Sequence, residues 1–356
     1  MSAAPSTRQL QFVQALNEAL DLCMAKDPRV FIVGLGAPDP AAVFGSTKGL
    51  VQKYGPKRVL DMPVAENAMT GVALGAALRG MRPVMTHVRL DFAMLAIDQI
   101  VNQAAKWYYM FGGQASVPLV IRMVVGRGWG QGAQHSQSLQ SWFAHVPGLK
   151  VVMPATPHDA KGLLIAAIED DNPVVFIEHR WLHNVRGPVP EGLYRVPIGP
   201  GNVLRNGRHV TIVATSYMTL EAVRAADELA REGIELEVVD VRTLNPFDET
   251  LVVESVRKTG RLIVADTGWR SVGFGAEVIA RVVERGLGDL KAPPIRITLP
   301  DVPTPTTRAL ANYYYPRVSD ITAAARRLLG RAPRLESEVE PDAFLDVPDA
   351  SFSWPS

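Results

Sequence analysis

Cysteine is almost absent from this sequence: Cys23 is the only one among 356 residues. An internal disulfide and a cysteine-rich zinc site are therefore excluded, and the composition fits a reducing cytosol, so we predict a cytoplasmic protein. The sequence also lacks the roughly 20 consecutive apolar residues that a membrane-spanning helix needs. Its first residues, MSAAPSTRQLQF, lack the apolar core of a signal peptide. We expect no membrane contact.

Neither sign of charge is in excess. The 37 basic and 36 acidic residues leave a net charge of +1, so there is no global field to attract nucleic acid or an anionic membrane. The 47% of hydrophobic residues suffices for a large core, and 21% charged residues is normal for a globular chain. The length suggests two domains of ordinary size, or one large one.

Several common catalytic motifs are missing as well. The glycines of the loop 126–132 alternate and do not form G-x-G-x-x-G, and no P-loop lysine follows them. Ser216 and Ser271 lack the G-x-S-x-G frame of a hydrolase. The histidines show no i, i+4 pairing with carboxylates that would indicate a metal site. Dinucleotide, hydrolase and zinc chemistry therefore have little support.

What the sequence does contain is an alternation of short β-branched runs with helical patterns. Such an alternation predicts an α/β fold with parallel sheets covered on both faces, in two doubly wound domains. The expected strands are 29–33, 82–87, 117–123, 149–153, 173–178, 209–215, 235–241, 261–265 and 295–299. The expected helices are 9–26, 92–107, 159–170, 219–232, 248–258, 275–285 and 321–329.

A Gly- and Pro-rich stretch without helical period separates the two halves. We predict a first domain at 1–190, a linker at 191–206 and a second domain at 207–330. Residues 331–356 are acidic and rich in proline, and their Phe344, Phe352 and Trp354 are expected to be exposed. We interpret them as a tail that is either disordered or an arm that docks on a neighbour.

The segment 61–80, DMPVAENAMTGVALGAALRG, is the most informative part of the chain. It predicts a turn at Pro63 and a helix that carries Glu66 in its first turn, where the helix dipole keeps a carboxylate ionised. Gly71 and Gly75 leave little bulk on this helix, although each glycine costs about 1 kcal/mol relative to alanine. The pattern indicates close approach of another element, or simply a cap and tight core packing.

Two other stretches are candidates for function. His135 lies in the polar sequence AQHSQS after the glycine-rich loop, where a histidine can transfer a proton near neutral pH or can be merely structural. The run 167–173, AIEDDNP, reads as a helix end whose free carbonyls can bind water or a cation, or as a plain turn.

Three long segments together resemble one family. They are DMPVAENAMTGVALGAALRGMRPV, DFAMLAIDQIVNQAAKWYYMFGG and AQHSQSLQSWFAHVPGLKVVMPATPHDAKGLLIAAIEDDNPVVFIE. Their order and spacing are similar to those of the β subunit of the E1 component of 2-oxo acid dehydrogenase complexes (pyruvate, branched-chain and acetoin types). The resemblance covers roughly residues 9–330. It implies a thiamine-diphosphate enzyme with a pyrimidine-binding domain followed by a transketolase C-terminal-like domain.

The resemblance also implies partners. In this family an α subunit holds the diphosphate through Mg²⁺ with a G-D-G…N motif, which this sequence lacks. We therefore expect an α₂β₂ heterotetramer whose active site is completed by the α subunit. A lipoyl-bearing E2 protein would receive the acyl group made from a 2-oxo acid.

Residue roles follow from the same resemblance. Glu66 matches the glutamate that hydrogen-bonds N1′ of the aminopyrimidine and favours the imino tautomer, whose nitrogen removes the C2 proton. Phe92 matches the aromatic residue that stacks on the pyrimidine, and Val64 the apolar residue beside it. His135 matches a histidine near the reacting carbonyl or the incoming lipoyl group. Positions that bind a monovalent cation such as K⁺, mostly through backbone carbonyls, are matched by Leu119, Ala167, Asp170 and Asn172.

The sequence departs from the family at three places. Leu35 follows Gly34 where the family usually has an acid, Gln140 stands where an acid is common, and the loop 126–132 is atypical. These departures leave a second reading open, a split transketolase-like subunit that forms or cleaves C–C bonds on a sugar or biosynthetic aldehyde without a lipoyl step. A non-catalytic scaffold is a third, disfavoured because Glu66, Phe92 and His135 are all retained.

Overall fold

The computed structural model describes residues 7–128, 130–332 and 352–355, and the chain divides into two compact units. Residues 1–126, 142–198 and 348–356 belong to the first unit, and residues 127–141 and 199–347 to the second. The segment 127–141 thus belongs to the second unit, although it falls inside the predicted first domain at 1–190. Both units have the predicted α/β architecture, so this fold class is confirmed.

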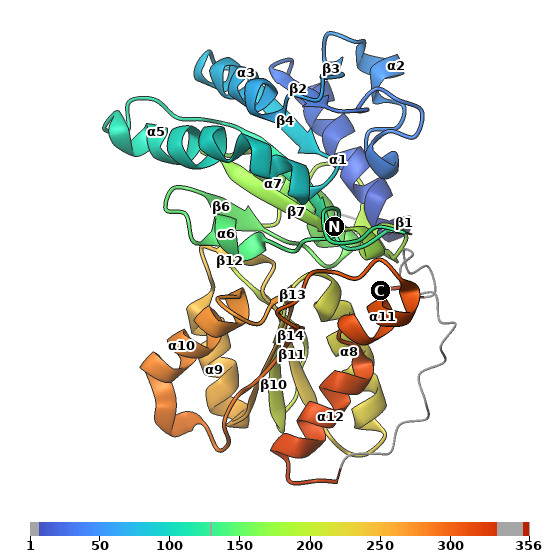
Figure 1. Ribbon diagram of the computed structural model, residues 1–356, viewed down its shortest axis with the longest axis vertical. Coiled ribbons are helices and arrows are strands. Elements are labelled where there is room, and N and C mark those ends of the chain that lie inside the picture. Colours follow the sequence, from blue (N-terminus) through green and yellow to red (C-terminus); the bar gives the residue numbers. More distant parts are fainter. Residues whose placement is uncertain (1–6, 129, 333–351, 356) are drawn as a thin grey trace, which may run out of the picture. The chain divides into compact units, whose positions relative to one another are not determined.

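The first unit is built on a parallel sheet (Figure 1). Its strands are rich in valine and isoleucine and buried on both faces, as expected for a parallel sheet with helical crossovers. In spatial order they are β6 (Lys150–Val152), β7 (Val174–His179), β5 (Val120–Val125), β4 (Arg82–His87), β2 (Val30–Gly34) and β3 (Val59–Leu60).

Helices cover this sheet. Helix α1 (Phe12–Lys26) packs against α7 (Pro157–Glu169), whose N-terminus is capped by the Thr156 hydroxyl, 3.0 Å from the Asp159 amide nitrogen. Helix α3 (Glu66–Leu78) packs against β4. The remaining helices of the unit are α2 (Leu50–Tyr54), α4 (Leu90–Ala93) and α5 (Ala105–Met110), with 3₁₀ turns η1 (Val43–Gly45), η2 (Met94–Ala96) and η4 (Arg180–Leu182).

The predicted helix at 92–107 forms as an unbroken helical run from Leu90 to Met110, but its winding changes along its length. The chain forms α4, then η2, then a π-helical stretch η3 (Asp98–Ala104), and only then α5. Apolar spacing does not distinguish these windings, because Ile100 and Ala104 are buried at a spacing that α- and π-turns share. The winding changes where η3 packs against α3, so tertiary contact decides it.

Strand β1 (Thr7–Gln11) pairs antiparallel with β8 (Arg186–Pro190), so the predicted helix at 9–26 begins only at Phe12. Contrary to expectation, Trp354 is buried, with only 5% of its surface exposed. Its amide donates to the Arg186 carbonyl at 2.8 Å, and its side chain lies over Gly187, where an added Cβ would come within 3.1 Å. Phe344 lies outside the described residues.

The second unit has its own sheet with an antiparallel edge strand. The order is β14 (Ile295–Leu299), β13 (Leu262–Trp269), β10 (Val210–Ala214), β11 (Leu236–Asp240) and β9 (Asn202–Arg205). Strand β9 lies within the predicted linker 191–206, which is therefore partly a strand, antiparallel to β11. The other elements are β12 (Thr243–Asn245), α8 (Tyr217–Ala230), α9 (Glu249–Thr259), α10 (Phe274–Gly286), η5 (Leu287–Asp289), α11 (Arg308–Tyr314) and α12 (Val318–Leu328).

A short helix, α6 (Gln140–Ala144), contains the point where the chain passes from the second unit to the first. No helix among the described residues has the length and apolar content to cross a membrane.

A charged cluster is buried inside the first unit. Arg122 on β5 and Glu178 on β7 are fully buried, with Nε and Oε1 2.6 Å apart. Arg122 Nη2 also donates to Ser46 Oγ at 3.0 Å, and His183 Nε2 lies 3.3 Å from Glu178 Oε2. Burial alone would raise the pKa of Glu178, but Arg122 and His183 outweigh it and hold that pKa below its usual value.

Glu178→Ala is expected to lower the free energy of unfolding by about 3–5 kcal/mol, because it leaves a buried guanidinium without its partner. Urea unfolding of this variant beside Glu191→Ala, a change at an exposed carboxylate, measures the loss. Since the folded-state pKa is depressed, the contribution is present above the unfolded value of about 4.3 and disappears as the pH falls through the folded value. A loss below about 1 kcal/mol at pH 7 would contradict the assignment.

Candidate functional site

The carboxyl ends of the parallel strands of the first unit form one edge of its sheet. In open α/β sheets this edge is where ligands bind. Five neighbouring strands end at this edge, and the segments that follow them contain the candidate site residues. These segments are 35–49 after β2, 61–66 after β3, 88–92 after β4, Gly126 after β5 and 180–183 after β7.

Glu66 is the first residue of α3, directly after its N-cap Ala65. The turn before it is closed by the Ala65 amide, which donates to the Pro63 carbonyl at 2.7 Å. Glu66 is only 4% exposed, yet its carboxylate has no hydrogen bond or ion pair within the described parts of the chain. The residue is thus mostly covered, while its carboxylate oxygens remain available as acceptors at the positive end of the α3 dipole.

Val64 and Phe92 are the other two residues predicted to face the cofactor. Val64 precedes Glu66 on the same segment and is 75% exposed. Phe92 lies in α4, after β4, and is half-buried. Strands β3 and β4 flank β2, so the structure brings these residues and Glu66 to the same edge of one sheet.

Leu35 occupies the end of β2 between two glycines. Gly34 passes so close to β4 that an added Cβ would lie 2.6 Å from the Thr86 carbonyl oxygen. The Gly36 amide donates to Asp61 Oδ1 at 2.9 Å, which fixes this turn against the Glu66 segment. The side chain at position 35 is apolar, so this turn brings no acid of its own to the edge before Asp39.

Two arginines that the sequence analysis missed also lie at this edge. Arg89 and Arg180 follow β4 and β7, and their guanidinium carbons lie 5.4 and 4.6 Å from the centre of the Phe44 ring. Arg89 is 3% exposed and Nη1 donates to the Gly126 carbonyl at 2.5 Å. Their positions in the sequence could have identified them, because each arginine comes within two residues of the end of a buried strand.

His135 lies in the second unit, on the segment 127–141. That segment packs against residues 304–306: the Thr304 hydroxyl donates to the Ser136 carbonyl at 3.5 Å, and Arg127 donates to the Thr306 carbonyl. The His135 amide closes a turn onto the Gly132 carbonyl at 3.2 Å, and the residue is partly exposed. Its turn leaves the imidazole in reach of solvent.

Gln140 has a clear partner in the same unit. Its Nε2 donates to Asp266 Oδ1 at 2.8 Å, and the Thr215 hydroxyl donates to the same oxygen at 2.8 Å. Complete burial raises the pKa of Asp266, against the lowering effect of these hydrogen bonds. An amide at position 140 suits this carboxylate, whereas an acid would place two carboxyl groups together.

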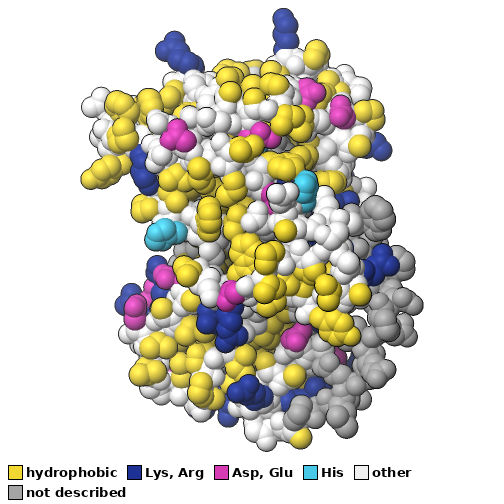
Figure 2. Space-filling model, viewed as in Figure 1, with side chains coloured by type: hydrophobic (Ala, Val, Ile, Leu, Met, Phe, Trp, Pro, Cys, Tyr) yellow, Lys and Arg dark blue, Asp and Glu magenta, His cyan; other side chains and the backbone are white. Residues whose placement is uncertain are grey.

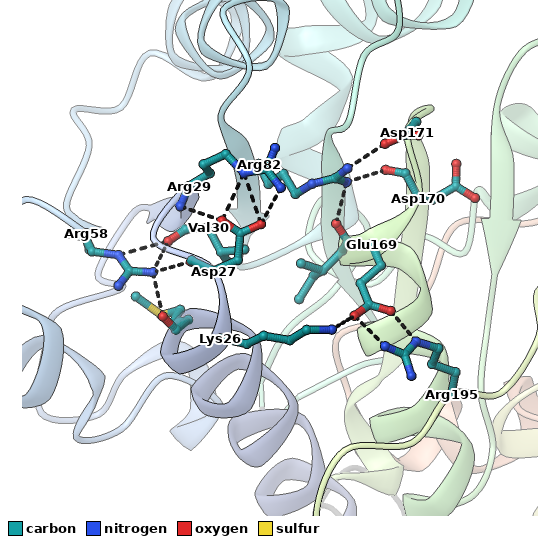
Figure 3. A network of polar contacts seen from close by, with 12 residues as sticks. Lys26, Asp27, Arg29, Val30, Arg58, Arg82, Glu169, Asp170, Asp171 and Arg195 are labelled. Atoms are coloured by element: carbon teal, nitrogen blue, oxygen red, sulfur yellow. Dashed lines mark hydrogen bonds and ion pairs between the residues drawn. The ribbon is translucent and has the colours of Figure 1, made fainter.

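The four positions predicted to hold a monovalent cation lie at the end of α7 and just before β5 and β7. Figure 3 shows one of them, Asp170, beside Arg82. Two cationic side chains already approach this place: Arg82 Nη1 donates to the carbonyls of Ile168 and Asp170, each at 3.0 Å, and Lys150 pairs with the Asp170 carboxylate. The Leu119 carbonyl accepts from the Val174 amide at 3.0 Å. Carbonyls at a helix C-terminus make this an electronegative site, and those of Ile168, Asp170 and Leu119 already accept hydrogen bonds within the protein.

Other members of the predicted cation set are placed nearby. Ala167 is buried in the last turn of α7, and the Asn172 amide donates to Asp170 Oδ1 at 2.9 Å. The acidic neighbour Glu169 is engaged elsewhere, by Lys26 and Arg195 (Figure 3). Cys23 lines a cavity of about 260 Å³ beside this network, and burial raises its pKa to about 12, so the thiol is unreactive.

An apolar surface covers α3 and the neighbouring helical segments of the first unit (Figure 2). Gly75 lies on the exposed side of α3, and an added Cβ there would meet nothing within 4 Å. Contiguous exposed apolar side chains of this kind mark an interaction surface. The surface is formed by Val64, Val72, Leu95, Tyr108, Tyr109, Met110 and Phe111.

Comparison with known protein families places this arrangement in a class. Residues 8–185 match the pyrimidine-binding domain of transketolase, and residues 199–321 match the transketolase C-terminal domain. A solved structure described as a split gene transketolase, an inactive β4 tetramer, is 26% identical with a TM-score of 0.74, and the match covers 91% of this chain and 99% of that chain. The fold is thus that of transketolase-like proteins.

Relatives with assigned functions indicate which family of transketolase-like proteins the chain belongs to. The chain is 46% identical to the β subunit of an acetoin:2,6-dichlorophenolindophenol oxidoreductase of Cupriavidus necator, over 90% of this chain and 98% of the relative. It is 44% identical to the mitochondrial pyruvate dehydrogenase E1 subunit beta-2 of Oryza sativa, over 92% and 88%. The chain belongs to the E1 β-subunit family of thiamine-diphosphate-dependent 2-oxo acid dehydrogenases.

Proposed function

We propose that this chain, with an α-type partner, decarboxylates a 2-oxo acid and transfers the acyl group to a lipoyl carrier. The partner would hold the diphosphate of thiamine diphosphate through Mg²⁺ with a G-D-G…N motif, in an α₂β₂ assembly. When bound, the cofactor supplies a carbanion-like carbon that adds to a carbonyl group. The chain's own residues bind and orient the aminopyrimidine and control its protonation.

The observation that carries this proposal is the partnerless carboxylate of Glu66. It is buried at the ligand-binding edge and accepts no hydrogen bond within the described residues, so an acceptor is available for a ring N–H such as N1′–H. An ionised carboxylate at that position holds a proton on the ring nitrogen and so favours the tautomer that acts as base. The apolar Val64 and the aromatic Phe92 at the same edge fit the faces of a heteroaromatic ring.

The exposed apolar surface on α3 supports a partner subunit. Glu66 begins the helix whose outer side, at Val72 and Gly75, is left exposed by the part of the chain that the structure describes. A partner that packs there would enclose the cofactor beside Glu66 and exclude water from it. His135 would serve as the proton donor or acceptor toward the substrate or the lipoyl group.

Coexpression with a G-D-G…N subunit tests the assignment. Purification through a tag on this chain is expected to yield both chains, and thiamine diphosphate with Mg²⁺ is expected to saturate the pair and not this chain alone. Reduction of an artificial electron acceptor by simple 2-oxo acids then reports decarboxylation without a lipoyl carrier. Failure of the saturated pair to oxidise any 2-oxo acid would refute the proposed activity.

The second candidate is a split transketolase-like subunit. It is favoured by the likeness to a split gene transketolase structure and by the apolar residue at position 35. The same purified pair separates the two functions, because ketose or acyloin donors support C–C transfer with no electron acceptor. We propose a cytoplasmic location because the one cysteine, Cys23, is buried and unpaired, and fractionation of cells tests it.

We also propose that the carbonyls of Leu119, Ala167, Asp170 and Asn172 help to bind K⁺ beside Arg82 and Lys150. The ion would share the negative end of α7 with these side chains and brace the loop before β7. Exchange of KCl for choline chloride at equal ionic strength is expected to lower the thermal unfolding midpoint by about 3 °C. Equal midpoints in the two salts would contradict the site.

A further inference from the structure

The loop 35–49 holds Phe44 in a strained backbone. Ala42, Val43 and Phe44 have φ values of 39°, 42° and 59°, the left-handed region that non-glycine residues rarely adopt. Each such residue costs of order 1–3 kcal/mol and persists only where surrounding contacts fix it. Backbone strain of this kind clusters at sites of function.

The contacts that fix this loop come from the core of the unit. Ser46 Oγ accepts from the buried Arg122 at 3.0 Å, and the Thr47 hydroxyl donates to the Ala37 carbonyl at 2.8 Å. Asn17 donates to the carbonyls of Ser46 and Lys48, each at 3.0 Å. Hydrogen bonds thus fix the loop at several points in spite of its strain, and 36% of the surface of Phe44 is exposed.

Two guanidiniums rest on the presented ring. Arg89 and Arg180 come from β4 and β7, the two neighbours of β5, and both lie within cation–π distance of Phe44. The nearest carboxylate on β7, Glu178, is already engaged by Arg122 and His183, and burial lowers the pKa of Arg180 from its usual value. Asp91, two residues after Arg89, can offset only one of the two positive charges.

The same edge contains a buried polar group without a partner. Neither ring nitrogen of His87, the last residue of β4, has a hydrogen-bond partner within the described parts of the chain. Burial lowers its pKa to about 4, so the ring is neutral and retains one N–H donor. Leu35, on the adjacent strand end, adds no negative charge. The part of this edge around Phe44 therefore carries two guanidiniums and a buried imidazole without a hydrogen-bond partner, whereas the carboxylates of Asp61 and Glu66 lie on the segment after β3.

We propose that Arg89 and Arg180 bind a second anionic group of the substrate, a carboxylate or a phosphate remote from the reacting carbonyl. Planar guanidiniums match the oxygens of either group and retain their charge when partly buried. They would not suit the carboxylate that leaves as CO₂, because two cations would stabilise it in the ground state and oppose its loss. This inference rests on the proposed function and narrows its substrate class.

The test compares substrates in the purified pair of subunits. 2-Oxoglutarate carries a distal carboxylate, xylulose 5-phosphate a distal phosphate, and 2-oxobutanoate an uncharged side chain. We expect the wild-type pair to have a higher kcat/KM for one of the two anionic substrates than for 2-oxobutanoate. The preferred substrate shows whether the bound group is a carboxylate or a phosphate. Arg180→Gln is expected to lower the ratio of kcat/KM for that substrate to kcat/KM for 2-oxobutanoate by about 10- to 100-fold, as for a lost charge-assisted hydrogen bond.

Two further variants separate recognition from structure. Arg186→Gln changes an exposed arginine of the same unit and is expected to leave the ratio unchanged. Arg180→Lys keeps the charge and is expected to restore part of it. A preference of wild type for 2-oxobutanoate, or an unchanged ratio in Arg180→Gln, would overturn the inference.

A binding measurement distinguishes failure of this inference from failure of the proposed function. Glutarate or inorganic phosphate is expected to raise the thermal unfolding midpoint of the wild-type pair and not of Arg180→Gln. If no 2-oxo acid is turned over but this shift is present, the anion subsite stands and the decarboxylase assignment falls. If 2-oxo acids are turned over and neither anion shifts wild type, the subsite falls alone.

Discussion

Glu66→Gln is expected to reduce turnover of the assembled enzyme by at least about 100-fold, the lower range for loss of an acid–base group. The amide keeps the size of the side chain but cannot hold a proton on the pyrimidine nitrogen as a carboxylate does. The fold should not suffer, because the carboxylate makes no hydrogen bond or ion pair within the described residues.

The measurement therefore combines rate and assembly. Steady-state rates with an artificial electron acceptor give the loss of turnover, and gel filtration and the thermal midpoint show whether the complex is intact. Glu191→Gln removes a surface carboxylate of the same unit as the matched control. Wild-type turnover in Glu66→Gln would end the catalytic interpretation of this residue, including its role in the E1-like proposal.

Gly75→Leu is expected to prevent association with the partner subunit while it leaves this chain folded. An added Cβ at position 75 meets nothing within 4 Å among the described residues, and leucine is the better helix former by about 1 kcal/mol. The thermal midpoint of the isolated chain should thus stay equal or rise. Across a packed interface the extra bulk costs about 1–3 kcal/mol, enough to weaken association tenfold or more.

Pull-down of the partner and elution volume on gel filtration measure this effect. Gly288→Leu is the control, because Gly288 is also exposed, an added Cβ there also meets nothing within 4 Å, and it lies in the second unit. A complex of normal size in Gly75→Leu would show that the partner packs elsewhere. Equal loss in both variants would point to general instability and not to an interface on α3.

Sequence patterning predicted most of the architecture because buried parallel strands and amphipathic helices have distinct periods. Strands such as 29–33 and 173–178 lie within a residue or two of β2 and β7. The elements that the sequence pattern did not predict have physical reasons. The apolar pattern between Leu90 and Met110 indicates a helix but does not reveal the local changes between α, 3₁₀ and π winding. Strand β9 forms in a Gly/Pro-rich stretch because β11 offers it a free edge.

The candidate site was predictable only in part. Glu66 could be identified because a lone acid at the start of a small-residue helix is a local pattern. Arg89 and Arg180 could not, since they are 91 residues apart in the sequence and meet only because β4 and β7 both flank β5. The burial of Trp354 was likewise missed, because it depends on β8 and not on the composition of the tail.

The strained turn at Ala42–Phe44 has a consequence for engineering. Glycine at position 42 or 43 would relieve an unfavourable φ and is the kind of change that a screen for heat resistance selects. Without this backbone restraint the Phe44 ring would occupy several positions. It would then no longer hold the guanidiniums of Arg89 and Arg180 together. Variants of this chain selected for thermal stability should therefore discriminate less between substrates. Thermal stability and substrate specificity would then be in conflict at this turn.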